Sequence, residues 1–190
     1  MPDLLKPRSV RAHEAVLAAT RSLLADGGYR AATVDAISTS SGVSKATIYN
    51  HWPSRAAVAA EAFGAEMAQA TPPPDTGSAR GDLAEQVRRV AAFYSGRWGA
   101  IFAELLAAGV DDEHGQEYFR RYFLDARRDN MRAMWARAQA TGEARPEIDA
   151  EVALDVLIGP LIFRLVTGHG PIDPDAAQQI AAAALDGLMR

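Results

Sequence analysis

The 23 residues from Thr33 to Arg55 read TVDAISTSSGVSKATIYNHWPSR. Thr33 and Ser44 each stand just before a short helical pattern, where a hydroxyl side chain accepts a hydrogen bond from a backbone N–H group of the first turn. Gly42 lies between the two patterns and permits a tight turn. Two short capped helices joined by a glycine turn predict a helix-turn-helix, a motif whose second helix can enter the major groove of DNA.

The apolar residues of this stretch indicate which face of each helix is buried. We expect Val43 and Ile48 to face a small core together with Ile37 and Leu24. Four side chains of the second helix then point outward: Lys45, Ala46, Tyr49 and Asn50. The start of this helix also presents backbone N–H groups and the hydroxyls of Ser44 and Thr47, which can bind phosphate.

The rest of the chain also reads as helical. Ala, Leu, Arg, Glu and Gln dominate and runs of β-branched residues are few, so the predicted fold class is all-α. With the two short helices, the apolar spacing predicts about nine helices; the other seven cover residues 10–25, 54–70, 80–94, 98–108, 112–140, 149–167 and 174–189. The predicted domains are a helix-turn-helix domain over residues 1–54 and a helical domain over residues 55–190.

Composition excludes several classes of protein. The 190 residues contain no cysteine, which excludes disulfides, zinc–cysteine sites and thiol catalysis. The longest apolar stretch, Val156 to Phe163, contains Gly159 and Pro160 and is followed by Arg164, so it is not expected to span a bilayer. Residues 1–10 contain no apolar run of the kind that is typical of a signal peptide. The expected location is the cytoplasm.

Charge is distributed unevenly along the chain. The net charge is −4, but residues 1–60 carry 7 Lys and Arg against 4 Asp and Glu, whereas the remaining residues are acidic. A basic head on an acidic body can bind DNA with one end only. Chance variation in composition is the alternative explanation of this asymmetry.

The order and spacing of residues within Val10–Phe63 resemble the DNA-binding signature of the tetracycline-repressor (TetR) family. A long helix is followed by a set of short motifs, which are Gly28-Tyr29, the Thr33 cap, Gly42-Val43-Ser44, Thr47-Ile48-Tyr49, an aromatic residue at position 52 and Ser54-Arg55. Two positions differ from the family pattern, because Ser38 and Ser41 replace the usual alanines and require backbone partners. Arg55 stands where lysine is more usual.

The resemblance implies roles for individual residues at a DNA interface. It implies phosphate contacts from Thr33, Thr47, Tyr49, His51 and Arg55, and contacts with base edges from Lys45, Ala46 and either Tyr49 or Asn50. Any one of these side chains could simply belong to a solvated helix face. The ordered set as a whole favours DNA binding.

The last two predicted helices suggest a dimer. Residues 149–167 are apolar nearly all round and need cover on both sides, and the last helix carries two apolar stripes. A four-helix bundle across a two-fold axis would provide that cover. The TetR resemblance implies the same arrangement, and residues 142–161 resemble one C-terminal subgroup of the family. The predicted interface residues are Val152, Val156, Arg164, Ile180, Ala184 and Leu188. A buried helix within a monomer is the alternative.

A small-molecule pocket is a further expectation for the body. The candidate lining residues are Phe93, Trp98, Phe102, Tyr122, Met131, Met134, Trp135 and Phe163, although bulky apolar residues at helical spacing also suit an ordinary core. An unidentified apolar or aromatic effector would suit them. Arg164 could pair with an acidic ligand, but Asp155 and Glu104 are the expected partners.

Nothing in the sequence predicts catalysis. The four histidines are scattered, and Asp111–His114 suits the start of a helix better than a metal site. No phosphate-binding glycine loop or Gly-x-Ser-x-Gly elbow is present, so no enzyme activity, metal or cofactor is expected. The predicted function is a dimeric regulator, a repressor released from a palindromic operator by its effector. The alternatives are a DNA-bound structural or partner-binding protein, or a helical enzyme with an incidental helix-turn-helix.

Overall fold

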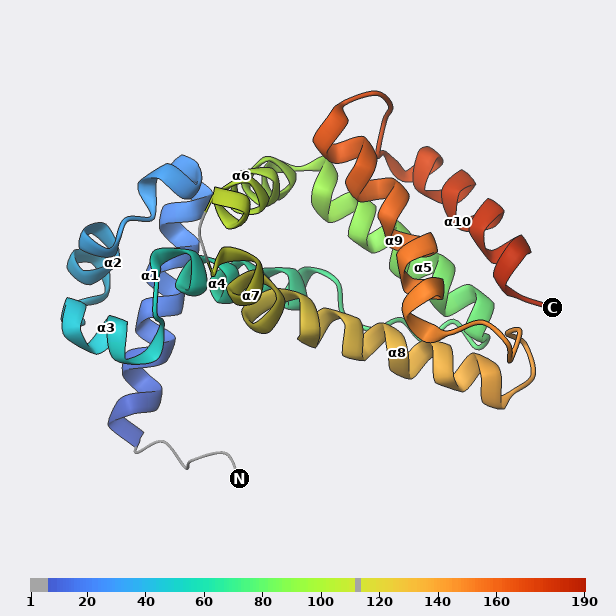
Figure 1. Ribbon diagram of the computed structural model, residues 1–190, viewed down its shortest axis with the longest axis horizontal. Coiled ribbons are helices and arrows are strands. Elements are labelled where there is room, and N and C mark those ends of the chain that lie inside the picture. The colour runs from blue at the N-terminus through green and yellow to red at the C-terminus, as the bar shows by residue number, and fades with distance from the viewer. Residues whose placement is uncertain (1–6, 112–113) are drawn as a thin grey trace. The chain divides into compact units, whose positions relative to one another are not determined.

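The computed structural model describes residues 7–111 and 114–190 (Figure 1). Within these residues the regular secondary structure is helical, apart from an isolated β-bridge between Ala144 and Met189. The predicted all-α class is confirmed. No helix in the described ranges is both long and apolar enough to cross a membrane.

Close packing divides the chain into two compact units. Unit 1 runs to Glu66 and includes Ala100–Leu124, whereas unit 2 comprises Met67–Gly99 and Asp125–Arg190. This division reflects packing density along the chain and does not test the functional boundary predicted between residues 54 and 55. That boundary stays a prediction.

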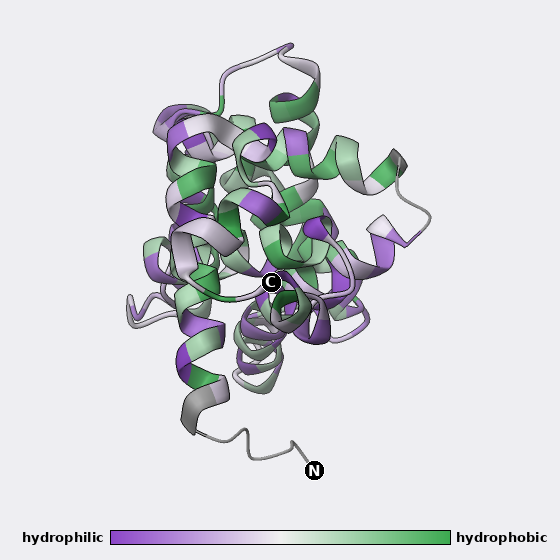
Figure 2. Ribbon diagram, turned by 90° about the vertical axis from the view of Figure 1, so that its left-hand side faces the viewer, coloured by the Kyte–Doolittle hydropathy of each residue, from purple (hydrophilic) through white to green (hydrophobic). Residues whose placement is uncertain are grey.

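Unit 1 contains α1 (Pro7–Ala31), α2 (Val34–Ser41), α3 (Lys45–His51) and most of α4 (Arg55–Ala70), whose last four residues belong to unit 2. α1 is kinked near its end, because Gly27 and Gly28 leave helical geometry and Gly28 has a φ of 67°. The sequence predicts a helix end at this point. Figure 2 shows polar and apolar segments along the helix that rises from the N-terminus, as an amphipathic helix requires.

The predicted helix caps are confirmed. Thr33 Oγ1 accepts a hydrogen bond from Ala36 N at 3.1 Å, and Ser44 Oγ accepts one from Thr47 N at 3.2 Å. At the start of α4, Ser54 Oγ accepts from the Ala57 N–H group. Each cap satisfies a backbone donor that has no partner within its own helix. Three helix starts are therefore determined locally.

The small core of the helix-turn-helix contains the apolar residues expected from the sequence. Leu24, Ile37 and Ile48 are almost completely buried, and Val43 in the turn is half-buried. Trp52, directly after α3, is only 1% exposed. Burial of these side chains on one face leaves the opposite face of α3 outward.

The remainder of unit 1 is organised around aromatic rings. α6 (Arg97–Asp111) belongs mostly to this unit, together with α7 (Gly115–Phe119) and the π-helical segment η1 (Arg120–Leu124). Phe63 of α4 lies 5.7 Å from Phe102 and 5.3 Å from Phe123, measured between ring centroids. Phe119 packs on Phe123 at 4.9 Å. Tilted and edge-on contacts of this kind stabilise an aromatic core.

The single regular helix predicted over residues 112–140 is corrected by the structure. Its first two residues lie outside the described residues and His114 is in a turn, while residues 115–140 form α7, η1 and α8 (Asp125–Ala140) in direct succession. The π-helical turn of η1 changes the angular position of every residue that follows it. When α7, η1 and α8 are counted as one helical segment, the described residues contain nine helices.

Unit 2 is a helical bundle built around α5 (Ala79–Ser95). α5 contacts α8, α9 (Ala150–Thr167) and α10 (Pro174–Leu188), and Figure 1 shows α5, α9 and α10 side by side. The core of this bundle consists of large apolar side chains with almost no exposure, among them Leu83, Trp135, Leu154, Leu157 and Leu185.

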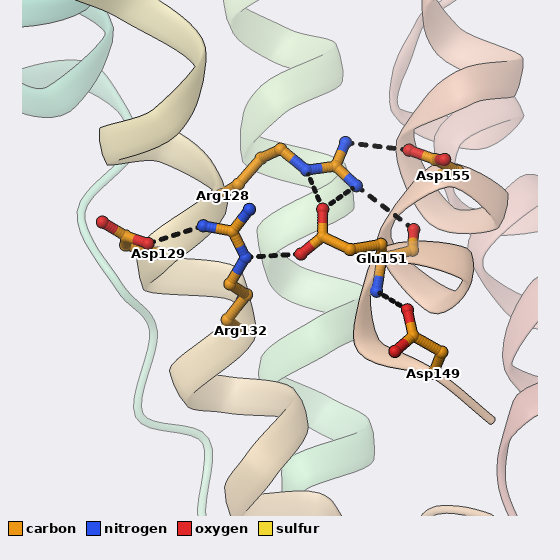
Figure 3. A network of polar contacts seen from close by, with 6 residues as sticks. All are labelled: Arg128, Asp129, Arg132, Asp149, Glu151 and Asp155. Atoms are coloured by element: carbon orange, nitrogen blue, oxygen red, sulfur yellow. Dashed lines mark hydrogen bonds and ion pairs between the residues drawn. The ribbon is translucent and has the colours of Figure 1, made fainter. Parts of the chain in front are cut away.

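An ion-pair network joins α8 to the N-terminal part of α9 (Figure 3). Arg128 of α8 donates to Glu151 at 2.6 Å and to Asp155 at 2.8 Å, and Arg132 also donates to Glu151. Asp149 caps α9 by accepting from the Glu151 N–H group. The hydrogen bond from Arg132, assisted by Arg128, lowers the pKa of Glu151 to about 2. The carboxylate therefore stays ionised at neutral pH and holds both arginines.

Candidate nucleic-acid interface

The outward face of α3 carries the residues that the sequence predicted there. Lys45, Ala46, Tyr49 and Asn50 are exposed, and Tyr49 is 52% exposed. The predicted orientation is confirmed, whereas the predicted contacts with DNA stay predictions.

The other predicted DNA contacts border this face. Thr33 and Ser44 are exposed at the starts of α2 and α3, and Thr47 and His51 are half-buried. The hydroxyls of Ser44 and Thr47 are hydrogen-bonded to each other at 2.9 Å. The two hydroxyls therefore form one local polar group at the start of α3.

Asp35 is a neighbour of Lys45 that the sequence analysis did not identify. Its carboxylate, in the first turn of α2, forms an ion pair with the Lys45 ammonium, and both side chains are more than half exposed. The hydrogen bond to Asp35 raises the pKa of Lys45. A pair so open to solvent exchanges partners easily, so phosphate or a base edge can compete with Asp35 for the ammonium.

The two serines that depart from the TetR pattern both bond to the turn. Ser38 Oγ donates to the carbonyl oxygen of Val43 at 2.8 Å, and Ser41 Oγ accepts from Val43 N at 3.2 Å. Gly42 has a φ of 69° and donates its N–H to Ser38 O. The expected backbone acceptor for Ser38 is confirmed. The turn that orients α3 is thus held by both side-chain and backbone hydrogen bonds.

Arg55 has a structural role that the sequence analysis missed. Its Nε donates to Ala32 O at 3.0 Å, another of its nitrogens donates to Tyr29 O, and its guanidinium lies 3.9 Å from the centre of the Tyr29 ring. Carbonyl oxygens at a helix end favour a nearby cation. Arg55 therefore ties the start of α4 to the end of α1, and its phosphate contact stays a prediction.

The predicted ligand residues divide between the two units. Phe102 and Tyr122 belong to unit 1, whereas Phe93, Trp98, Met131, Met134, Trp135 and Phe163 belong to unit 2. Most of them are buried, but Phe163 is 61% exposed on α9. Phe93 and Trp98 are stacked with their ring centroids 5.9 Å apart. Their joint participation in one pocket stays a prediction.

Unit 2 contains an open groove that the sequence did not predict. It encloses about 600 Å³ between the N-terminal half of α5 and α10, with Ala84, Ala181 and Leu185 among its lining residues. Arg80 and Arg88 also line it, but each is already paired, Arg80 with Asp186 and Arg88 with Glu85. The groove therefore has an apolar floor and a charge-compensated rim.

One face of α9 is apolar and exposed. Val152 is 54% exposed and Val156 is 41% exposed, and Phe163 and Val166 follow at helical spacing. On α10, Ile180 and Ala184 are half-buried, whereas Leu188 is only 5% exposed because it packs inside its own chain. The apolar stripe of α9 is defined here as Val152, Val156, Phe163 and Val166.

The partners of Arg164 differ from those expected. Its Nη1 donates to Pro171 O at 2.8 Å, within the loop between α9 and α10. Asp155 instead pairs with Arg128, and Glu104 accepts a hydrogen bond from Tyr29 N. The expectation that Arg164 pairs with Asp155 or Glu104 is therefore wrong.

Metal-binding side chains do not gather within the ranges that the structure describes, where no three His, Asp or Glu residues are close enough to hold an ion. Asp112 and Glu113, part of the acidic stretch considered above, lie outside the described residues.

Comparison with known protein families identifies both halves of the chain. A family model described as bacterial regulatory proteins, tetR family, matches residues 16–62, and one described as tetracyclin repressor-like, C-terminal domain, matches residues 73–184. The chain belongs to the TetR family. TetR-family proteins are transcriptional regulators and not enzymes; they bind DNA and act as dimers.

Individual TetR-family proteins match nearly the whole chain. An uncharacterised HTH-type transcriptional regulator, YdeS of Bacillus subtilis (strain 168), is 33% identical over 183 residues, which are 96% of this chain and 92% of that protein. The crystal structure of the TetR family transcription regulator SCO0332 has 30% identity and a TM-score of 0.86, covering 93% and 98% of the two chains. The structure of FadR from Bacillus subtilis with stearoyl-CoA shares the fold, with 14% identity, a TM-score of 0.67 and coverage of 92% and 98%.

The contacts of Arg55 predict the effect of a conservative substitution. Arg55→Lys keeps the charge but cannot donate to two carbonyl oxygens and lie over the Tyr29 ring at once. We expect the free energy of unfolding to fall by about 1 kcal/mol, measured by denaturant titration. Arg30→Lys, at an exposed position of the last turn of α1, is the matched control. Equal stability of the two variants would contradict the capping role.

Proposed function

We propose that this TetR-family protein is a dimeric repressor that binds a palindromic operator and is released from it by a small apolar or aromatic effector. The observation that carries the proposal is the exposed face of α3, presented by a turn that Ser38, Ser41 and Gly42 hold in place. The description of the matching C-terminal family as repressor-like supports repression. Because its target would be chromosomal DNA, the proposed place of action is the cytoplasm.

In the proposed complex α3 lies in the major groove. Lys45, Ala46 and Asn50 would contact base edges, with the methyl group of Ala46 suited to a thymine methyl. The remaining predicted contacts would bind the phosphates on either side, from Thr33, Ser44, Thr47, Tyr49, His51 and Arg55. Exposure of the α3 face and the half-buried positions around it support this division of roles.

The proposed dimer uses the apolar stripe of α9. Val152 and Val156 expose apolar surface, and a partner copy would remove that surface from water. Ile180, Ala184 and Arg164 would contribute to the same interface in this proposal. A two-fold dimer presents two recognition helices, and paired half-sites about one DNA turn apart multiply the affinity of each.

The proposed effector binds among the helices of the body. FadR, which shares the fold, was crystallised with stearoyl-CoA, a ligand with a long apolar chain. In this chain Trp135 is completely buried, and its Nε1 donor has no hydrogen-bond partner among the described residues. A buried donor without a partner is unfavourable, so an effector with an acceptor beside its apolar body would satisfy it. By linkage, such an effector would release DNA only if it favours an arrangement of the dimer's two helix-turn-helix domains that does not fit the operator.

A second candidate is a DNA-bound structural or partner-binding protein of the same fold without a small-molecule ligand. The burial of Phe93, Met131 and Met134 favours it, because these side chains already fill the interior of unit 2. Effector binding distinguishes the two candidates.

The DNA-binding part of the proposal is tested by selection from genomic fragments. Purified protein at a stated salt concentration is expected to retain fragments that share a palindrome, with half-sites about one turn apart. Retention without sequence preference would contradict operator recognition and favour the structural alternative.

A DNA duplex that carries the palindrome recovered from the genomic fragments tests the face of α3. We expect Tyr49→Ala and Lys45→Ala each to weaken binding by about tenfold, the loss of roughly one charge-assisted contact, while the unfolding midpoint and the oligomeric state stay unchanged. Arg120→Ala removes an exposed cation from η1 and serves as the control. If Tyr49→Ala unfolds the protein, the outward assignment of this face is wrong.

The dimer is tested at the centre of the apolar stripe. Val156→Glu would bury a charge in the proposed interface, so we expect the dimer dissociation constant to rise by about 100-fold or more, measured by analytical ultracentrifugation. Val110→Glu places the same charge on α6 at a valine that is 72% exposed. A dimer unaffected by Val156→Glu would place the interface elsewhere.

The effector is tested with a panel of apolar and aromatic compounds that carry a hydrogen-bond acceptor. A true effector at 100 times its dissociation constant stabilises the folded state by about 2.7 kcal/mol, so it should raise the unfolding midpoint and also release the selected duplex. Stabilisation without release would identify a ligand that does not regulate. No response across the panel would favour the structural alternative.

A further inference from the structure

Glu61 of α4 bonds to two other helical segments of unit 1 with its two carboxylate oxygens. Oε1 lies 2.8 Å from His13 Nε2 on α1, and Oε2 lies 2.6 Å from Trp52 Nε1, directly after α3. The side chains of Glu61 and His13 are both 27% exposed, and Trp52 is 1% exposed. The Glu61 side chain therefore links α4, α1 and the residue that follows α3 at a partly buried site.

The chemistry of the three side chains determines which atoms donate the two hydrogen bonds. An ionised carboxylate only accepts hydrogen bonds, so Glu61 accepts one from the Trp52 indole N–H and one from His13 Nε2. The His13 ring is stacked on the Trp52 ring, with centroids 4.6 Å apart. The other His13 nitrogen, Nδ1, is buried without a partner among the described residues. Glu61 is therefore the polar anchor of both rings.

Of the three residues Glu61, His13 and Trp52, Trp52 is the one that directly follows the recognition helix α3. Its backbone N–H donates to Ile48 O at 2.9 Å and closes the last turn of α3. His51, the preceding residue, has its ring 5.6 Å from the Trp52 ring and 5.8 Å from the His13 ring. The residue that Glu61 holds is thus both the C-terminal cap of α3 and a direct neighbour of His51, the proposed phosphate contact.

We propose that Glu61 is a positioning residue for DNA recognition, which fixes the end of α3 to α4 by holding Trp52 and His13 together. The inference rests on the proposed DNA-binding function. It adds a residue that contacts no DNA itself and acts through Trp52 and His51. Glu66, on the same helix, provides a comparison, because its ion pair is with Arg21 of α1 and not with α3.

The test compares three variants of the full chain. Glu61→Ala removes both acceptors, Glu61→Gln keeps one acceptor for Trp52 in a side chain of the same shape, and Glu66→Ala removes a carboxylate of similar exposure from α4. The first readout is hydrogen exchange of the backbone amides of α3, together with the NMR signal of the Trp52 indole N–H, assigned with Trp52→Phe. It needs no DNA.

We expect Glu61→Ala to speed amide exchange at the end of α3 by about tenfold and to shift the Trp52 indole signal. Glu61→Gln should restore most of the protection, and Glu66→Ala should leave both readouts as in the wild type. If Glu61→Ala and Glu66→Ala behave alike, the positioning role is wrong. If Glu61→Ala does not fold, the comparison of Trp52→Phe with Glu61→Gln decides. Trp52→Phe loses the indole donor and should speed exchange at the end of α3, whereas Glu61→Gln keeps the acceptor and should retain most of the protection. Equal exchange in these two variants would overturn the positioning role.

The second readout is affinity for the duplex recovered from genomic fragments. We expect Glu61→Ala to bind it about tenfold more weakly than Glu66→Ala at a temperature where both are fully folded. A purely structural role would lower stability without this loss. If the wild type itself retains no specific duplex, the proposed function fails, while the exchange of the α3 amides still decides whether Glu61 positions the helix.

Discussion

A helix of seven residues does not hold its shape in water, and this constraint governs the head of the protein. α3 is that short, so its conformation depends on what surrounds it. Ser44 closes one end and Trp52 the other, while Ile48 is buried beneath the middle. Gly42, with its left-handed conformation, turns the chain so that these contacts can form together. Every outward side chain of α3 takes its direction from these four residues.

The parts of the head that were predictable from sequence are those whose causes are local. Thr33, Ser44 and Ser54 cap helices through atoms three residues away, and the apolar period of residues 37–48 reveals which face is buried. Arg55 and Glu61 were not predictable in this way, because their partners on α1, Tyr29 and His13, lie 26 and 48 residues distant along the chain. A cation at a helix start and a glutamate on an alanine-rich helix look like solvated side chains until the fold brings α1 alongside.

The body was predictable in outline and not in its functional detail. The helices and their apolar faces follow from spacing, but the π-helical turn of η1 has no strong sequence signal. The ligand residues illustrate a further limit. Trp135 and Phe163 look equivalent in the sequence, yet one is completely buried and the other is 61% exposed. Which side of an apolar helix faces the core, a ligand or a partner depends on the packing of every other helix.

The contacts along α4 indicate how the head would respond to an effector. Arg55, Glu61 and Glu66 span three turns of this helix, and each bonds to α1, with Glu61 also bonding to Trp52. Bonds spread over three turns resist sliding and tilting of α4 against α1 far better than one contact would. A displacement of α4 would therefore carry α1, α2 and α3 with it as one body. On this argument the proposed effector would change the position of intact recognition helices and would not unfold them, since unfolding would break all three sets of bonds together.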